Sequence, residues 1–250
     1  MKKINILGAM VDRVTMEEAV EKALGFLKEE GSHAIYTPNS EIVMAAYRDP
    51  SFCEVLNSGD LIIADGIGLV HASKILKEPL PERVAGFDLA SRLIRESADG
   101  AHSLYFFGGR PGVAQKAIAN LKAEYPNLSV SGFSDGYFDA EKEKTIIADI
   151  KEKKPDILFV CLGAPKQEKW IAAHRDELGV PLCLGVGGSL DVWAGEVERA
   201  PEKYQKAGLE WLYRLMKQPS RFFRMLELPK FGLTVLFKGK AVQTKGKRHE

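Results

Sequence analysis

The most informative part of the sequence is Leu158–Trp170, LFVCLGAPKQEKW, in which an apolar run ends at Gly163 and small and polar residues then begin a helix. The run Ile157–Leu162 is short, branched and uninterrupted, which is typical of a strand buried on both faces of a parallel sheet. The residues that follow therefore lie at the carboxyl end of a strand. At this edge of open α/β sheets, helix N-termini offer unpaired N–H groups to anionic and nucleotide ligands.

Strand and helix signals alternate along most of the chain. The predicted strands are Ile4–Leu7, His33–Tyr36, Leu61–Ala64, Ser103–Phe107, Leu128–Gly132, Ile157–Leu162 and Pro181–Leu184. Predicted helices span 40–47, 66–76, 87–98, 112–124, 141–153 and 167–177, after a first helix in which Thr15 and Glu18 have capping-box spacing. Such alternation requires β-α-β crossovers, so we expect an α/β fold with a Rossmann-like, mostly parallel sheet flanked by helices.

The charges are unevenly divided along the 250 residues, although the net charge is only +1. Residues 199–250 hold thirteen Lys and Arg against four Glu, a balance of +9, and residues 1–198 sum to −8. Aromatic residues such as Trp211 and Phe231 interleave with the basic ones, a mixture that suits an anionic membrane surface. We therefore expect an α/β domain over 1–198 and a C-terminal basic amphipathic helical appendage, ending in a solvated tail, over 199–250.

The cysteines and the apolar segments favour a cytosolic protein. Cys53, Cys161 and Cys183 have no C-x-x-C pairing, which favours reduced, buried thiols over disulfides or a zinc site. The N-terminus lacks the sustained apolar core and the small-residue cleavage site of a signal peptide. The run Phe231–Phe237 is too short to span a bilayer.

Small and polar residues follow five of the predicted strands. They are Pro38–Glu41, Asp65–Gly66, Gly108–Gly112, Gly163–Glu168 and Gly187–Asp191. Because parallel strands end at one edge of a sheet, we expect these loops to share one rim and one site. Some have structural alternatives, since Asn39 can cap a helix and the pair Gly108-Gly109 can make a tight turn. Two glycines between a strand and a helix also let a phosphate approach the backbone.

Asp65 stands out among these residues, because a carboxylate directly after LIIA lies at the mouth of a buried sheet. Desolvation at such a position raises the proton affinity of a carboxylate, as acid-base chemistry requires. The structural alternative is a cap for the helix that begins at Gly66.

Several catalytic signatures are missing from the sequence. G-x-G-x-x-G, G-x-x-x-x-G-K-[ST], G-x-S-x-G and H-E-x-x-H do not occur, which disfavours dinucleotide oxidoreductases, P-loop enzymes, serine hydrolases and zinc proteases. D-x-D is missing as well. A nucleotide-sugar enzyme without that acidic pair must neutralise its leaving diphosphate with Arg, Lys and helix dipoles in place of a divalent metal.

Six segments in one order carry a family resemblance. They are TPNSE (37–41), ADGIGLV (64–70), PERVAGFDL (81–89), FFGGRPGV (106–113), LGAPKQEKW (162–170) and GVGGSLDVWAGEVERAPE (185–202). The sequence resembles the WecG/TagA/CpsF family of bacterial glycosyltransferases, and its basic aromatic region up to about residue 237 resembles the family's C-terminal appendage. Within the family the likeness is greatest to the TagA-type enzymes of wall teichoic acid synthesis.

The resemblance implies an inverting, metal-independent hexosyltransferase that needs no cofactor. TagA-type enzymes move N-acetylmannosamine from its UDP donor to N-acetylglucosamine on undecaprenyl diphosphate, forming a β-1,4 linkage. The expected partners are thus a UDP-sugar, a polyprenyl-diphosphate-linked acceptor and the anionic inner face of the cell membrane, with no nucleic acid. The donor stays open, since relatives use N-acetylmannosaminuronate or glucose, and so does a homo-oligomer formed through an apolar face of the appendage.

The resemblance also assigns roles to residues of the rim. Asp65 is expected to be the general base that takes the proton from the 4-hydroxyl of the acceptor in a single, inverting displacement. Thr37 and Asn39 are expected to hold sugar or acceptor hydroxyls, and Gln167, which both donates and accepts, suits a sugar hydroxyl. Arg83 is expected to meet the diphosphate as negative charge builds there.

Other roles concern the nucleotide and the appendage. Gly108, Gly109 and Gly187 form the expected nucleotide loop, and Asp191 either accepts from the uracil or ribose or caps the turn that follows it. Three arginines of the appendage bind lipid head groups, clamp the diphosphates, or do both in sequence. They are Arg214, Arg221 and Arg224.

Two other classes of function stay open from the sequence alone. A nucleotide-dependent oxidoreductase fits the strand-end glycines but lacks the dinucleotide fingerprint. A non-catalytic module that binds lipid or nucleic acid fits the basic tail, but it leaves the carboxylate of Asp65 without a purpose.

Overall fold

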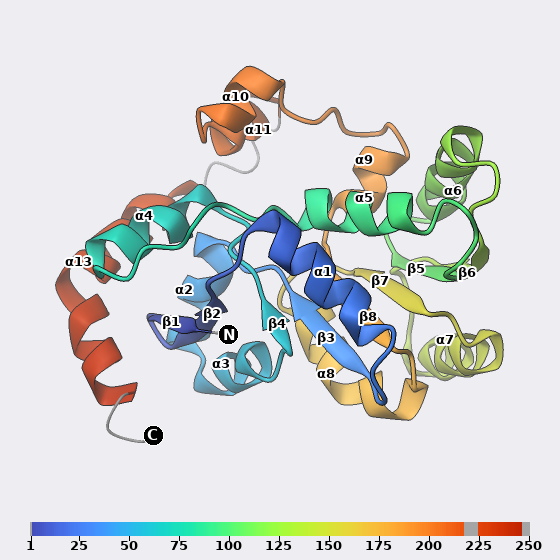
Figure 1. The fold of residues 1–250 in the computed structure, drawn as a ribbon, viewed down its shortest axis with the longest axis horizontal. Helices are drawn as coiled ribbons and strands as arrows, with labels where there is room; N and C mark the ends of the chain where they lie inside the picture. The colour runs from blue at the N-terminus through green and yellow to red at the C-terminus, as the bar shows by residue number, and fades with distance from the viewer. Residues whose placement is uncertain (1, 218–224, 247–250) are drawn as a thin grey trace.

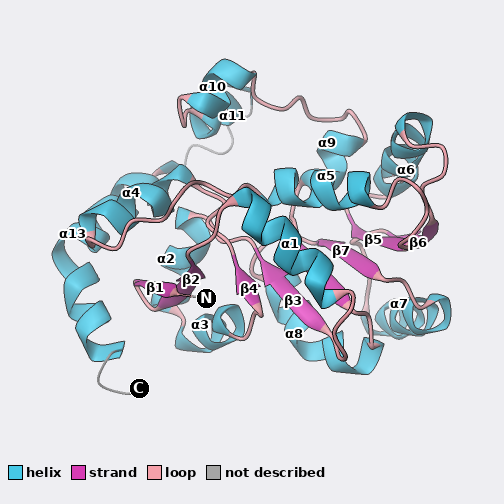
Figure 2. Ribbon diagram, in the orientation of Figure 1, coloured by secondary structure: helices cyan, strands magenta, loops and turns pink. Residues whose placement is uncertain are grey.

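A parallel sheet of six strands forms the centre of the computed structural model, which describes residues 2–217 and 225–246. Its strands are β3 (His33–Tyr36), β4 (Leu61–Ile62), β5 (Leu104–Gly108), β6 (Val130–Ser134), β7 (Ile157–Cys161) and β8 (Leu182–Gly185). The spatial order is β4-β3-β8-β7-β5-β6, and all five neighbouring pairs are parallel (Figure 2). The predicted α/β fold with a mostly parallel sheet is confirmed.

Helices cover both faces of this sheet, and a hydrophobic cluster fills each face (Figure 1). One layer contains α1 (Met16–Phe26), α5 (Gly86–Glu96), α6 (Val113–Glu124) and α9 (Ser189–Trp193). The other contains α2 (Ser40–Arg48), α3 (Pro50–Asn57), α7 (Ala140–Lys153) and α8 (Lys166–Leu178). Side chains alternate between the layers, since Phe106 and Phe159 face the first and Tyr105 and Leu158 the second.

All seven helices predicted between Thr15 and residue 177 are present, and two further helices of the α/β body were not predicted. The capping box of the first helix is confirmed, because the Thr15 hydroxyl accepts from the Glu18 N–H and the Glu18 carboxylate from the Thr15 N–H. The short helices α3 and α9 were not expected. Two more, α10 (Glu202–Lys206) and α11 (Glu210–Lys217), belong to the C-terminal segment.

The first predicted strand lies outside the main sheet. β1 (Lys3–Ile6) pairs antiparallel with β2 (Ala9–Asp12), a strand that was not predicted, in a separate hairpin. Leu7 and Gly8 form its turn with φ of 54° and 100°, the two positive φ values that match the twist of hairpin strands. Leucine rarely occupies such a position, so the sequence at Leu7 gives no turn signal and the two strands resemble one.

The C-terminal helix α13 (Glu227–Gly246) completes the core beside α2, α4 (Ile67–Ile75) and β1. Phe231 and Val235 are 3% and 1% exposed within the same hydrophobic cluster as these elements. Arg48 of α2 also donates to Glu227 at 2.6 Å. The domain division after residue 198 stays a prediction, and cutting the chain there would expose part of the core.

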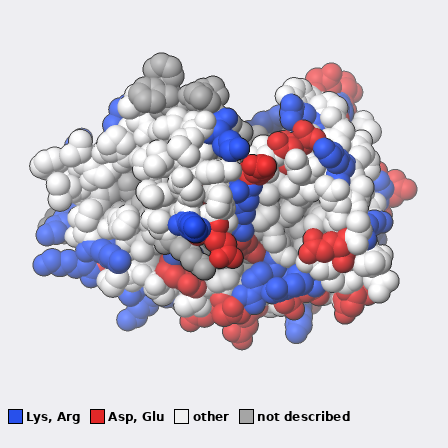
Figure 3. Space-filling view, turned by 90° about the horizontal axis from the view of Figure 1, so that it is seen from above, with Lys and Arg blue, Asp and Glu red and all other residues white. Residues whose placement is uncertain are grey.

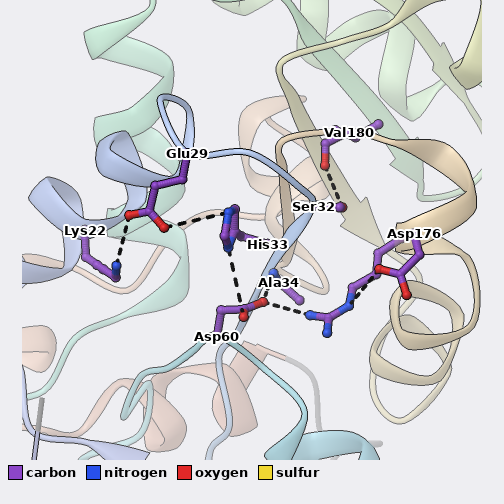
Figure 4. Close-up of polar contacts among 9 residues, drawn as sticks. Lys22, Glu29, Ser32, His33, Ala34, Asp60, Asp176 and Val180 are labelled. Carbon is purple, nitrogen blue, oxygen red and sulfur yellow. Dashed lines mark hydrogen bonds and ion pairs between the residues drawn. The ribbon is translucent and has the colours of Figure 1, made fainter.

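At the amino edge of the sheet, Asp60 joins β3 to α8 (Figure 4). Its Oδ2 accepts from the Ala34 N–H and from Arg175, both at 2.8 Å, and its Oδ1 lies 4.0 Å from His33 Nδ1. We predict that Asp60→Ala lowers the free energy of unfolding in urea by about 1–3 kcal/mol, because it leaves the Ala34 N–H and the Arg175 guanidinium without this acceptor.

Asp176→Ala is the matched control for that measurement. The Asp176 side chain is 91% exposed and contacts the same Arg175 at only 3.8 Å. We expect a change below about 0.5 kcal/mol there. Equal losses of unfolding free energy in the two variants would mean that Asp60 does not stabilise the junction of β3 and α8.

Candidate active site

The five loops singled out in the sequence lie at one edge of the sheet, as predicted, because β3, β4, β5, β7 and β8 are parallel neighbours. The chain leaves β5 toward β6 and leaves β7 toward β8, in opposite directions along the sheet. This point between β5 and β7 is a topological switch point, where open α/β sheets bind ligands. Helices α10 and α11 lie above the same edge (Figure 1).

Asp65 is half-buried three residues after the end of β4, and its carboxylate faces the start of α5. Oδ1 accepts from the N–H of Gly86, the first residue of that helix, at 2.9 Å. The structural alternative from the sequence, a cap for the helix after Gly66, is wrong, because that N-terminus has no side-chain cap. The positive end of α5 therefore fixes the Asp65 carboxylate at the rim.

Thr37 and Asn39 lie next to Asp65. The Thr37 hydroxyl donates to the Gly185 carbonyl at 2.8 Å, and a Cβ at Gly86 would come within 2.9 Å of Thr37. Asn39 caps α2, accepting from the Ile42 N–H at 3.0 Å, so its structural alternative is confirmed. Its amide nitrogen has no hydrogen-bond partner within residues 2–217 and 225–246. The structure thus brings the predicted base together with the two residues predicted to bind hydroxyls.

Gln167 lies beneath the rim, with only 2% of its surface exposed. Its Oε1 accepts from Gly163 N–H at 3.1 Å and from Gly187 N–H at 2.9 Å, which joins the loops after β7 and β8. Its Nε2 donates to Glu168 Oε1 at 2.9 Å. A direct contact of Gln167 with a sugar hydroxyl stays a prediction; the contacts present make it a brace between two glycine loops.

Backbone geometry explains the presence of glycine in the loops after β5 and β8. A Cβ at Gly108, where φ is 132°, would lie 2.3 Å from the Cys161 carbonyl oxygen, so only glycine lets β5 end against β7. Gly109 and Gly187 also have positive φ, 70° and 50°. Close packing explains Gly108, whereas an approach of phosphate to these loops stays a prediction.

Asp191 lies in the first turn of α9 and faces the loop after β5. Its Oδ1 is 3.9 Å from Arg110, and its backbone carbonyl accepts from the N–H groups of Glu196 and Val197. The turn that follows is thus held by the Asp191 backbone. The carboxylate is 29% exposed, so its proposed contact with a ribose or uracil is compatible with the geometry.

Arg83 is paired with the C-terminal segment. It donates to Glu210 of α11 at 3.0 Å, and the two side chains are only 17% and 13% exposed. A Cβ at Gly208 would lie 3.0 Å from Ile67, so α10 and α11 contact the start of α4, two residues from Asp65. Glu210 was not predicted to lie at the site; its one signal in the sequence was an acidic residue within a basic segment.

The arginines of the appendage are only partly accounted for. Arg214 belongs to α11, and Arg221 and Arg224 lie outside the described residues. That these three arginines share a common face stays a prediction.

Glu168, fully buried beside Gln167, was not predicted as a site residue, because a charged residue in the first turn of a helix is usually exposed to solvent.

The residues that the structure describes contain no group of three or more His, Cys, Asp or Glu placed to hold a metal ion. The predicted free cysteines are confirmed, with Cys161 and Cys183 buried and Cys53 half-buried.

The carboxylate of Asp65, the amide of Asn39 and the glycine loops lie along one edge of the parallel sheet, and together with Arg83 they define an α/β enzyme site suited to an anionic, nucleotide-linked substrate. The chain belongs to the family described as "Glycosyl transferase WecG/TagA/CpsF family", whose match covers residues 4–245.

Three relatives share this similarity over most of their length. A Bacillus subtilis (strain 168) protein is 36% identical over 88% of this chain and 85% of its own. A Staphylococcus aureus (strain MW2) protein is 36% identical over 92% and 90%, and a Bacillus spizizenii protein 38% over 84% and 81%. Each is named N-acetylglucosaminyldiphosphoundecaprenol N-acetyl-beta-D-mannosaminyltransferase.

Proposed function

We propose that this chain transfers N-acetylmannosamine from UDP-N-acetylmannosamine to N-acetylglucosamine-diphospho-undecaprenol in wall teichoic acid linkage-unit synthesis. The observation that carries the proposal is the shared name of relatives at least 36% identical, each aligned over more than 80% of both chains. The position of Asp65 on a rim of glycine loops supports it.

In the proposed reaction Asp65 removes the proton from the acceptor 4-hydroxyl as that oxygen attacks the anomeric carbon. The carbon–oxygen bond to UDP breaks in the same step, so the anomeric centre inverts and UDP leaves with the electron pair. The Gly86 N–H that binds Oδ1 keeps the carboxylate in one orientation for this transfer. Thr37 and Asn39 flank the acceptor, and Arg83 and arginines of the appendage neutralise the leaving diphosphate.

The surface of the C-terminal segment supports a membrane-bound acceptor. Seven of the ten exposed large hydrophobic side chains of the described residues lie between 209 and 237, with Phe237 the most exposed at 77%. Exposed lysines of α13, among them Lys230 and Lys238, stand beside them. Seen from above, a broad part of the surface carries few charged side chains (Figure 3). No helix of residues 2–217 or 225–246 is long and apolar enough to cross a bilayer. We propose peripheral binding to the anionic inner face of the cell membrane.

The membrane proposal makes one prediction. The double variant Phe237→Ser, Leu233→Ser removes two exposed apolar side chains of α13. It is expected to reduce co-sedimentation with phosphatidylglycerol vesicles at least about fivefold. The reason is that burying each side chain in the membrane interface contributes about 1 kcal/mol or more to binding. Tyr137→Ser, which removes a side chain 64% exposed on the body of the protein, is the control and should sediment like the unchanged chain. Equal retention by both variants would contradict this surface.

The function itself is tested by UDP release with several UDP-sugars and a soluble lipid-diphosphate-linked N-acetylglucosamine, with and without EDTA. Release with UDP-N-acetylmannosamine that EDTA leaves unchanged is the expected result. Release only with UDP-N-acetylmannosaminuronate or UDP-glucose would move the chain to another surface-polysaccharide pathway. A fold that NAD stabilises and UDP does not would favour the oxidoreductase.

A further inference from the structure

Glu168 is a buried carboxyl group with only one of its two oxygens hydrogen-bonded to another side chain. The side chain is 0% exposed, its Oε1 accepts from Gln167 Nε2, and its Oε2 has no hydrogen-bond partner in the described part of the chain. Asp12, the other fully buried acid there, instead binds the Ile62 N–H at 2.9 Å and Lys3 at 3.5 Å. A buried, half-satisfied carboxyl costs stability, so an apolar residue would serve the core better.

The surroundings of Glu168 disfavour the charged form of its carboxyl group. Burial raises the pKa of this carboxyl, and no cation of the described residues lies within ion-pair distance to offset the desolvation. Two titratable groups packed nearby are neutral, since burial raises the pKa values of Tyr36 in β3 and Cys183 in β8. The Tyr36 hydroxyl donates to the Glu168 backbone carbonyl at 3.3 Å and not to the carboxyl group.

Among the described residues, Gln167 is the side chain that hydrogen-bonds to this carboxyl group, and the contact helps to set which way the Gln167 amide faces. With Nε2 directed to Glu168, Oε1 faces both Gly163 N–H and Gly187 N–H. A flipped amide would direct its N–H bonds at two N–H groups and its oxygen at the oxygen of Glu168. The acceptor at Glu168 and the two loop amides therefore enforce one orientation.

We propose that Glu168 is a positioning residue, which fixes the Gln167 amide so that the loops after β7 and β8 are held at the separation that the sugar-nucleotide donor requires. The inference rests on the proposed function for the identity of the donor. It assigns to Gln167 and Glu168 a joint role beneath the site, where neither needs to touch substrate.

Two variants of Glu168 test whether it braces the Gln167 amide. Glu168→Gln keeps a carbonyl acceptor for Gln167 and should keep the donor KM, whereas Glu168→Met keeps the volume without the acceptor. The donor KM of Glu168→Met is expected to rise about tenfold, the loss of roughly one net hydrogen bond, with kcat changed much less. Glu177→Gln, at an exposed carboxylate of the same helix, is the control and should leave both constants unchanged.

The pH profile gives a signature that a packing role would not give. Gln167→Glu sets two carboxyls against each other, so they must share a proton, and its donor KM should improve as pH falls. The reciprocal exchange, Gln167→Glu together with Glu168→Gln, restores a donor opposite an acceptor and should recover the unchanged chain's KM without that pH dependence. An unchanged KM in Glu168→Met, or an exchange no better than Gln167→Glu alone, would overturn the proposal.

Amide NMR separates this proposal from the proposed function. Exchange of the Gly163 and Gly187 amide protons with solvent should quicken in Glu168→Met and return to normal in the reciprocal exchange, whatever the substrate is. If the unchanged chain binds no UDP-sugar while these amides respond as expected, the proposed function fails and the brace stands. Amides that do not respond would overturn the brace alone.

Discussion

Asp65→Asn is expected to lower kcat about 10²–10⁴-fold, the usual contribution of a positioned general base, while UDP binding changes little. Asparagine keeps an oxygen that can accept from the Gly86 N–H, so the start of α5 and the fold should be preserved. The amide cannot take the proton of the acceptor hydroxyl, so the loss should fall on kcat and not on donor KM. Single-turnover kinetics with the donor in excess, and calorimetry with UDP, measure the two effects.

Asp65→Ala separates catalysis from structure at the same position. It removes the acceptor of the Gly86 N–H as well as the base, so it should also lower the unfolding temperature, which Asp65→Asn should not. Undiminished turnover in Asp65→Asn would remove the catalytic assignment. Equal thermal losses in both variants would mean that the carboxylate charge, and not only its position, holds α5.

Arg83→Ala should lower kcat about 10²–10³-fold, the loss expected when one group that stabilises developing charge is removed. Arg83 is held by Glu210 at 3.0 Å, so meeting a diphosphate requires it to exchange one anionic partner for another. Glu210→Gln weakens the competing partner and should therefore tighten UDP binding, whereas Arg83→Ala should loosen it.

The decisive result is a change of UDP affinity in opposite directions for the two variants, measured by calorimetry. If the ion pair served only to dock α11, both variants would loosen the segment and shift UDP affinity in the same direction. Arg92→Ala serves as the control, because that arginine also pairs with a glutamate but joins α5 to Glu17 of α1 and not to α11. Deleting residues 199–250 would be a poorer test, since α13 contributes Phe231 and Val235 to the core.

The sheet and the location of the site could be predicted from the sequence because their signals are local. Runs such as Ile157–Leu162 have the composition of buried strands, and the break at Gly163 marks the strand end within one residue. Parallel pairing then places the five loops at one edge. The hairpin was missed because its turn begins with Leu7, which carries no turn signal.

The partners of the site residues could not be predicted, because they depend on distant contacts. Asp65 binds the N–H of Gly86, 21 residues away, and Arg83 pairs with Glu210, 127 residues away. Gln167 has the donor and acceptor that its sugar role required, yet both are directed to the protein. The residue type determines which hydrogen bonds and ion pairs a side chain can form, and the fold determines which partners it meets.

The transfer reaction itself tests the proposed function. The purified chain is incubated with UDP-N-acetylmannosamine and a soluble lipid-diphosphate-linked N-acetylglucosamine, and the anomeric configuration of the new linkage is read by NMR. We expect release of UDP only when the acceptor is present, with a β-linked disaccharide product. An α-linked product, or UDP release that does not depend on the acceptor, would contradict the proposed function.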